Sequence, residues 1–258
     1  MKKRFSKVRS QDFAQPPAKG RSFAAFYNSL PHILKASDLK AVAEAVVKAR
    51  KAKKGVIFMA GAHVIKCGLN PIVIELIKKK IITCICLNEA VRQGVRQGFG
   101  LGYAVASKIY ASKLAHKNLS LLYNAYKNNI PVCVFVAVGT DIIHQHPSFN
   151  AALTAEGSLR DFHSLVENIA GLNRGGVVLN FGSAVVLPEV FLKALNLSRN
   201  LGNKVKDFVT ANFDMIFHYR PQQNVVSRPV SSGGKGYYII GHHEIMLPLL
   251  AQAVIEKA

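Results

Sequence analysis

Short apolar runs alternate with amphipathic segments along most of the chain. Apolar runs bounded by turns are typical of strands buried on both faces, whereas apolar residues at every third or fourth position are typical of helices. Because helical patterns lie between the runs, the chain predicts an α/β fold, a Rossmann-like parallel sheet with helices on both faces. The predicted strands are residues 55–59, 81–87, 132–138, 176–180, 206–210 and 237–240.

Residue types at the ends of the helical patterns predict where helices begin. We expect Ser37-Asp38 to cap the first helix, and Asn70-Pro71 has the residue types of an N-cap and a first helical position. Basic residues 1–30, interrupted by Pro16-Pro17, predict a loosely ordered arm before a single α/β domain at 31–258. The predicted helices are residues 39–53, 70–80, 89–113, 119–128, 157–172, 188–199 and 244–257.

The charge of the chain is strongly basic and uneven. Its 258 residues include 34 Lys and Arg against 14 Asp and Glu, and residues 1–54 hold 14 basic and 3 acidic residues. This arm could bind nucleic acid through phosphates, but nucleic acid is the weaker hypothesis because charge runs are usually solvated faces. Met1-Lys2-Lys3-Arg4 precedes no apolar stretch, and no run reaches the roughly 18 apolar residues of a membrane span. We therefore expect a cytoplasmic protein without membrane contact.

The cysteines lie in or beside apolar runs, so we interpret them as reduced core residues. Cys84 and Cys86 share one face of a strand, but no second ligand pair follows at zinc spacing. His144 and His146 also lack the helical spacing that aims two imidazoles at one ion. No metal site is predicted. The four cysteines are Cys67, Cys84, Cys86 and Cys133.

Glycine-rich polar turns follow the predicted strands. In a parallel sheet these turns meet at the edge formed by the carboxyl ends of the strands, where α/β proteins bind ligands. Glycines let backbone N–H groups approach a phosphate closely, so the turns together indicate a nucleotide site. None of them has the spacing G-x-G-x-x-G, and plain structural turns remain the alternative. The turns contain residues 60–63, Asn88, residues 139–146, residues 181–183, residues 210–214 and residues 241–244.

Two segments carry the most specific chemistry. The run that ends at Val138 is followed by Thr140 and Asp141 and then by two histidines, which places hydroxyl, acid and imidazole groups at the carboxyl end of a strand. Lys235 lies in the stretch SSGGKG. A lysine held in a tight, desolvated glycine loop can act as a nucleophile and form an imine with a substrate. A solvated loop cation is the alternative for this lysine.

From about residue 55 to its end, the chain resembles the deoxyhypusine synthase family, in particular its bacterial branch. The resemblance rests on several segments taken in order: IPVCVFVAVGTD, GGVVLNFGSAVVLPEVFLKALNL, TANFD followed by RP, GGKG, and IMLPLL. It implies a Rossmann-like fold that binds NAD at a subunit interface, in a homotetramer of paired subunits.

The resemblance also implies a reaction. The enzyme would be an NAD-dependent transferase that moves an aminobutyl group from spermidine or a related polyamine, through an imine on lysine, to a protein lysine or a small amine. Lys235 matches the imine-forming lysine, and Asp141 matches an acid on the cofactor. With the turn residues, this predicts cofactor contacts at Gly61, Ala62, Asn88, Thr140, Asp141, Gly182, Ser183, Thr210, Ala211 and His242. Predicted substrate contacts are Asp214 and Glu189 together with His144 and His146, which the resemblance does not cover.

Three positions depart from the family. The chain has no Trp and places Gly233 before the Gly-Lys pair, Pro188-Glu189 stands where the family has a histidine, and His242 stands where it has an acid. These departures leave two alternatives open, a catalytically altered NAD- or nucleotide-binding relative and a polyamine enzyme of the homospermidine synthase type.

Overall fold

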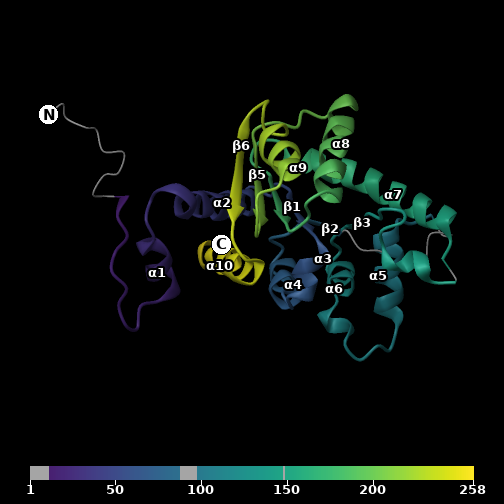
Figure 1. The fold of residues 1–258 in the computed structure, drawn as a ribbon, viewed down its shortest axis with the longest axis horizontal. Helices are drawn as coiled ribbons and strands as arrows, with labels where there is room; N and C mark the ends of the chain where they lie inside the picture. The colour runs from purple at the N-terminus through teal and green to yellow at the C-terminus, as the bar shows by residue number, and fades with distance from the viewer. Residues whose placement is uncertain (1–11, 88–97, 148) are drawn as a thin grey trace.

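A computed structural model describes residues 12–87, 98–147 and 149–258 of the chain, and in these residues six strands form one parallel sheet (Figure 1). The predicted parallel α/β fold is therefore confirmed. The strands pair in the order β3-β2-β1-β4-β5-β6. They are β1 (Val56–Ala60), β2 (Cys84–Leu87), β3 (Val132–Val134), β4 (Val177–Phe181), β5 (Phe208–Asp214) and β6 (Gly234–Ile240).

Helices cover both faces of the sheet. One face packs on α2, α4, α6 and α10 and the other on α7 and α8, each through its own cluster of buried apolar side chains. The helices are α1 (Phe23–Ser29), α2 (Leu34–Lys51), α3 (Ala62–Lys66), α4 (Asn70–Lys78), α5 (Leu101–Ala111), α6 (Leu121–Lys127), α7 (Ala151–Ile169), α8 (Val186–Asn200), α9 (Tyr219–Pro221) and α10 (His243–Lys257).

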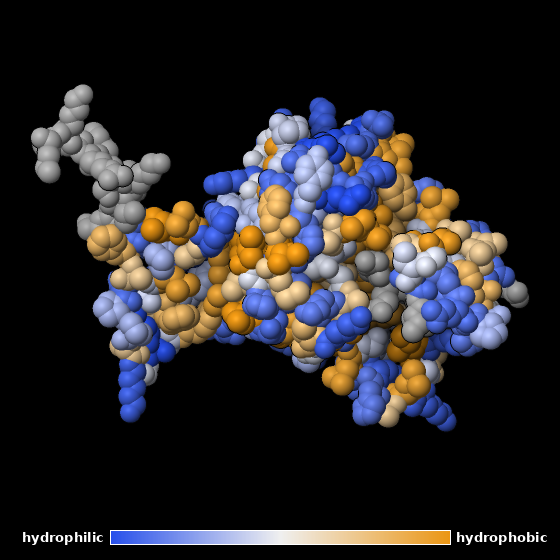
Figure 2. All heavy atoms as spheres, in the orientation of Figure 1, coloured by the Kyte–Doolittle hydropathy of each residue, from blue (hydrophilic) through white to orange (hydrophobic). Residues whose placement is uncertain are grey.

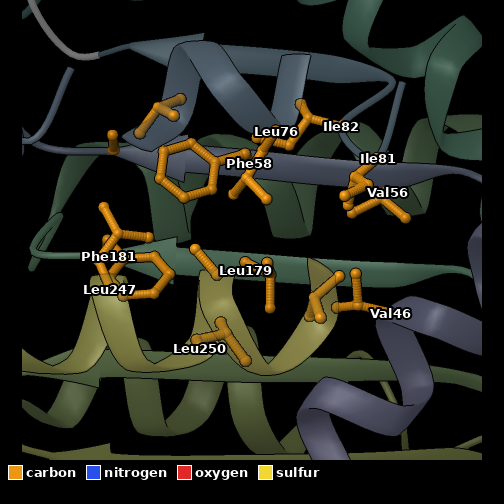
Figure 3. Packing of buried hydrophobic residues seen from close by; sticks show 14 of the residues in the cluster. Val46, Val56, Phe58, Leu76, Ile81, Ile82, Leu179, Phe181, Leu247 and Leu250 are labelled. Atoms are coloured by element: carbon orange, nitrogen blue, oxygen red, sulfur yellow. The ribbon is translucent and has the colours of Figure 1, made fainter. Parts of the chain in front are cut away.

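Alternation along the strands decides which face each side chain covers. Phe58 and Leu179 point toward α10, where they pack near Leu247 and Leu250 (Figure 3). Their neighbours in sequence, such as Ile57, belong to the cluster on the opposite face. Since every residue of β1 is buried, the continuous apolar run that predicted this strand is explained by a sheet covered on both sides.

Several strand boundaries differ from the prediction, and β2 begins at Cys84 rather than at residue 81. Strand β3 ends at Val134 rather than at residue 138, because its partner β2 ends at Leu87. Strand β5 continues to Asp214, past the predicted end at residue 210, since β4 and β6 pair with it on either side. Strand β6 begins earlier than predicted, at Gly234. Hydrogen bonds between the backbone of β5 and both neighbouring strands thus outweigh the low strand preference of the polar residues in β5.

The beginning of the chain also differs from the prediction. Helix α2 begins at Leu34, so Ser37-Asp38 lies inside the helix, where Asp38 pairs with Lys35 rather than capping it. Within the predicted arm, Ser22 caps α1 and the ring of Tyr27 is buried. The arm is therefore ordered from Phe23 to Ser29, whereas the division of the chain at residue 30 stays a prediction. In the part of the chain that the structure describes, no helix is long and apolar enough to span a membrane.

Candidate functional site at the carboxyl edge of the sheet

The order of the strands marks one place at the sheet edge. Chain order runs outward from β1 to β3 on one side and from β4 to β6 on the other. Neighbouring strands β1 and β4 therefore send their following segments to opposite faces, and in sheets of this order ligands bind beyond the carboxyl ends of these two strands. This 3-2-1-4-5-6 order is the one on which dinucleotide-binding sheets are built.

The turns after β1 and β4 contact each other through their backbones. The N–H of Gly61 donates to the carbonyl of Phe181 at 2.9 Å, and the N–H of Gly182 donates to the carbonyl of Phe213 at 3.0 Å. A Cβ atom on Gly61 would lie 2.3 Å from the carbonyl oxygen of Gly182. Only glycine fits at this position, as expected where two turns meet at the floor of a ligand crevice.

His243 lies against the second turn. Gly182 has a φ of +67°, and a Cβ there would lie 2.6 Å from the Cε1 atom of His243. The Nε2 atom of this buried histidine is 3.2 Å from the carbonyl of Phe213, so Nε2 donates to it, and in a neutral ring Nδ1 is then an acceptor. Nδ1 is buried without a partner. The ring of His63 lies 5.5 Å away, centroid to centroid.

Buried polar side chains continue from this edge into the sheet. The Nδ2 atom of Asn180 donates to Oδ1 of Asn212 at 2.6 Å and to the carbonyl of Ser183 at 2.9 Å. Oδ1 of Asn180 and Oγ1 of Thr210 are buried without hydrogen-bond partners. Burying such atoms costs free energy, and unpaired ones need an explanation such as a water molecule or a ligand.

Asp214, His218 and Tyr238 gather where β5 and β6 end. The carboxylate of Asp214 is buried, accepts from the N–H of Met215, and lies 3.8 Å from Nε2 of His218. The hydroxyl of Tyr238 accepts from the N–H of His218 and donates to the carbonyl of Ile216. Burial raises the pKa of Tyr238, and the charge of Asp214 acts in the same direction. An acid and an imidazole are thus held close together by fixed backbone contacts.

The structure brings some of the predicted contacts together and separates others. Gly61 lies against Gly182 and Ser183, so these two turns come together at the carboxyl edge. The cofactor contacts predicted for them and for Ala62 stay predictions. Thr210 and Ala211 do not lie in a turn, because β5 extends through them and both are buried within the sheet. Their predicted place in a loop was therefore wrong. The prediction for Asn88 lies outside the described residues.

The turn that follows β3, at residues 139–146, forms hydrogen bonds mainly within its own segment. Thr140 hydrogen-bonds the carbonyl of Ala137, while Oδ2 of Asp141 accepts from the N–H of Ala137 at 3.1 Å. This turn follows β3, two strands away from β1. His144 packs edge-on against Phe149, and the imidazole nitrogens of His144 have no hydrogen-bond partner. The cofactor contact predicted for Asp141 stays a prediction, with a structural use of its carboxylate now visible.

Glu189 and His242 also have local partners. The Glu189 carboxylate accepts from Lys193 at 2.7 Å and from Asn224 at 2.9 Å, and lies 3.6 Å from the Arg220 guanidinium. The hydrogen bond from Lys193 is the largest cause that lowers the pKa of Glu189. His242 is the N-cap residue of α10 and is exposed, with Glu244 at 3.8 Å. His146 is likewise exposed. The contacts predicted for these three residues stay predictions.

Lys235 does not have the environment that the sequence predicted. It is the second residue of β6 and pairs with Val209, whereas Asp214 pairs with Ile240 at the other end of the strand. The two ends are about 16 Å apart along an extended strand. Lys235 is exposed, and its Nζ atom lies 5.2 Å from the ring centroid of Tyr237. Hydrophilic residues gather on this side of the molecule, at the top of the view (Figure 2). The prediction that Lys235 lies in a desolvated glycine loop was wrong, because Gly234 and Gly236 are residues of strand β6.

Several site residues escaped the sequence reasoning. Asn180 and Asn212 interrupt the buried strands VVLNF and FVTANFD, and a polar residue inside an apolar run is the signal that could have found them. His218 had no such signal, since its place depends on how residues 215–218 return toward Tyr238. His243 lies in the predicted turn 241–244 but was not predicted as a site residue, and its burial follows from its position at the start of α10.

Comparisons with known proteins identify relatives of the fold. No protein-family model matches the chain, and no curated protein matches it. The solved structures that resemble it include ArgZ, an arginine dihydrolase from the ornithine-ammonia cycle in Cyanobacteria, at 16% identity and a TM-score of 0.54. The alignment covers 87% of this chain and 33% of ArgZ. The chain therefore spans about a third of that relative.

Two further structures have the same fold. The ternary complex of AgrE with ornithine and NAD+ is 15% identical with a TM-score of 0.57, over 86% of this chain and 33% of AgrE. A conserved LOR/SDH protein from Methanococcus maripaludis S2 is 14% identical with a TM-score of 0.51, over 87% of this chain and 70% of that protein. At these identities the likeness shows the fold alone.

These neighbours correct the assignment made from sequence. The fold neighbours are ArgZ, AgrE and the LOR/SDH protein rather than a deoxyhypusine synthase, and no family model or curated protein supports that family. The resemblance was therefore wrong, and with it the aminobutyl transfer from spermidine through a lysine imine. Its motifs were short strand and turn segments of an apolar-strand α/β sheet, which unrelated families with this architecture share.

Proposed function

We propose that the chain binds NAD in the crevice beyond the carboxyl ends of β1 and β4, as the cofactor-binding part of an amino-acid oxidoreductase. The observation that carries the proposal is the 3-2-1-4-5-6 strand order with glycine turns at its switch point. A second support is the likeness of the fold to AgrE, whose structure contains ornithine and NAD+.

The residues at the crevice fit a dinucleotide. Gly61 and Gly182 leave their backbones open to close approach by a phosphate, and neither position accepts a Cβ, which would collide with the carbonyl of Gly182 or with the ring of His243 respectively. Next to them, Nδ1 of His243 and Oδ1 of Asn180 are buried acceptors without partners. The amide, hydroxyl and ribose groups of NAD offer the hydrogen-bond donors that such atoms require.

The acid and imidazole on the β5–β6 side can bind and deprotonate an amine. NAD, when bound, supplies a hydride acceptor for the carbon that carries the amine of the substrate. Asp214 would hold the ammonium group through charge-assisted hydrogen bonds. His218, whose Nε2 lies 3.8 Å from Asp214, would accept the proton that leaves the nitrogen as the carbon loses its hydride. Because Asp214 is buried and His218 is partly exposed, this proton would pass from the edge of the sheet toward solvent.

Binding of NAD by the purified chain tests the first part of the proposal. Isothermal titration with NAD+ and NADH should show one site per chain, and Gly61→Ala should weaken it at least tenfold because its methyl group would displace the turn at Gly182. Gly171→Ala is the matched control, since a Cβ there meets only ordinary contacts at 3.7 Å. Absence of binding at millimolar NAD+ and NADH, or equal binding by a folded Gly61→Ala variant, would overturn the cofactor assignment.

Turnover tests the second part separately. Formation of NADH should be followed with a panel of amino acids that includes ornithine, arginine and lysine. Asp214→Asn should keep its NAD affinity and lose at least 90% of turnover, whereas Asp38→Asn, a change in an exposed ion pair, should retain both. If NAD binds but no amino acid reduces it, the cofactor site stands and the amino-acid reaction fails.

A further inference from the structure

Three buried thiols converge on the face of the sheet opposite α10. Cys84 and Cys86 project from β2 and Cys133 from β3, and their sulfur atoms all lie within 4.8 Å of one another. All three side chains are fully buried in the cluster that α7 and α8 cover. Cys67, the remaining cysteine, lies outside this group and is half-buried.

We propose that Cys84, Cys86 and Cys133 bind Cu(I) in a three-sulfur site. Metal–sulfur bonds of about 2.3 Å place three sulfur ligands about 4 Å apart around one ion. The present separations are within 4.8 Å, so small rotations of the side chains bring the sulfurs to that spacing. The geometry comes from the sheet itself, because Cys86 and Cys133 occupy paired positions on neighbouring parallel strands and Cys84 lies two residues before Cys86.

The kinds of atom around the cluster favour a soft ion. Met59 pairs with Cys86 in the sheet and belongs to the same buried cluster, which adds a thioether to the surroundings. Thiolate and thioether ligands select Cu(I), zinc and iron–sulfur clusters over hard cations. Structural zinc almost always takes four ligands in a tetrahedron. Among the described residues a group of three metal-ligating side chains is found here, with no fourth member, and three ligands suit Cu(I) better than zinc.

The nearest hard ligand is already engaged. Oδ2 of Asp161 accepts hydrogen bonds of 2.8 Å from the N–H groups of Gly102 and Val134. Its carboxylate is thus committed to backbone and cannot turn to the sulfurs without leaving these donors unpaired.

Helix α7, which covers the thiol cluster, also forms one wall of a pocket. This pocket of about 630 Å³ lies between α5 and α7 and the start of β3, and Asp161 and Ser164 line it. Ser164 belongs to α7, and its neighbour Leu165 packs in the same buried cluster as the three thiols.

Anaerobic competition with a chromophoric Cu(I) chelator tests the site on the whole chain. The wild type should remove one Cu(I) per chain from the chelator. Cys86→Ser and Cys133→Ser should bind at least 100-fold more weakly, while the matched control Cys67→Ser should be unchanged. X-ray absorption of the Cu(I)-loaded wild type should show three sulfur neighbours at about 2.3 Å. A hundredfold excess of Zn(II) should not displace the copper.

Each opposite result overturns the proposal. These results are the absence of stoichiometric Cu(I) binding, binding that survives Cys133→Ser, binding that depends on Cys67, displacement by zinc, and a copper environment of nitrogen or oxygen neighbours. Because serine in an apolar core can destabilise the fold, Cys133→Ala and a thermal melt of each variant accompany the titrations. If the variants do not fold, the absorption spectrum of the wild type still decides the outcome.

Discussion

Two groups of buried polar atoms differ in how completely they are paired. Asp161, buried between α5, α7 and β3, accepts from the N–H groups of Gly102 and Val134. At the carboxyl edge of the sheet, by contrast, His243 and Asn180 each have a buried atom without a partner. The paired acid holds segments of the fold together, whereas under the proposed function the unpaired atoms at the edge are the ones that a bound polar ligand would pair.

The largest effect should come from removing the paired acid. Asp161→Ala leaves two buried N–H groups without an acceptor, so the free energy of unfolding should fall by about 2–5 kcal/mol. Urea denaturation followed by circular dichroism measures this change. Asp38→Ala, at an exposed ion pair, should change stability by less than about 0.5 kcal/mol. A loss below about 1 kcal/mol for Asp161→Ala contradicts its structural role.

A smaller effect is expected for the amide pair at the edge. Asn180→Leu or Asn212→Leu alone should lower the free energy of unfolding by about 1–3 kcal/mol, since each leaves the other buried amide without its partner. The loss of unfolding free energy in the double variant should be smaller than the sum of the two single losses by at least about 1 kcal/mol, because neither amide is then left buried without a partner. It should also bind NAD at least tenfold more weakly. Additive losses in a double-mutant cycle would show that the two amides do not act as a pair.

The pH dependence of stability gives a third distinction. Burial raises the pKa of Asp161 to about 7, against the lowering effect of its backbone hydrogen bonds. Between the unfolded value near 3.9 and about pH 7, the folded state therefore holds a proton that the unfolded state has lost. Stability should fall across this window as pH rises, by up to about 1.4 kcal/mol per pH unit. Asp161→Asn should remove this contribution, and identical slopes for both proteins would contradict it.

The smallest effect is expected at Lys235. Its side chain is exposed at the amino end of β6, away from both groups of buried polar atoms. Lys235→Ala should change the free energy of unfolding by less than about 0.5 kcal/mol and leave NAD affinity within about twofold. A clear loss of NAD binding in calorimetry would show that Lys235 contributes to the NAD site. It would contradict the assignment of that site to the carboxyl edge of the sheet alone.

The sequence predicted the layers of the fold better than the site. Apolar runs such as VIFMA predict a strand covered on both faces, because a parallel strand inside a covered sheet buries every one of its side chains. The glycine turns after β1 and β4 were also predictable, since close backbone approach requires glycine. Strand order was not, because it depends on contacts between segments far apart in the chain.

Local patterns failed where tertiary pairing decides the outcome. Residues 210–214 look like a polar loop, yet hydrogen bonds with both β4 and β6 hold them in a strand. The stretch SSGGKG looks like a nucleophile loop, yet its last residues begin β6. Asp161 was visible in principle, because it lies on the same helical face as the buried Leu165 and Ile169. An acid at a core position of an amphipathic helix is a signal of buried pairing.

Hydrogen–deuterium exchange with and without NAD+ tests the central claim most directly, because it reports on both regions in one experiment. The account predicts slower exchange on NAD+ binding in residues 60–68 and 180–187, the turns after β1 and β4, and unchanged exchange in residues 98–103 and 160–167 around Asp161. Protection confined to the segments around Asp161, or none at saturating NAD+, would contradict a dinucleotide site at the carboxyl edge of the sheet.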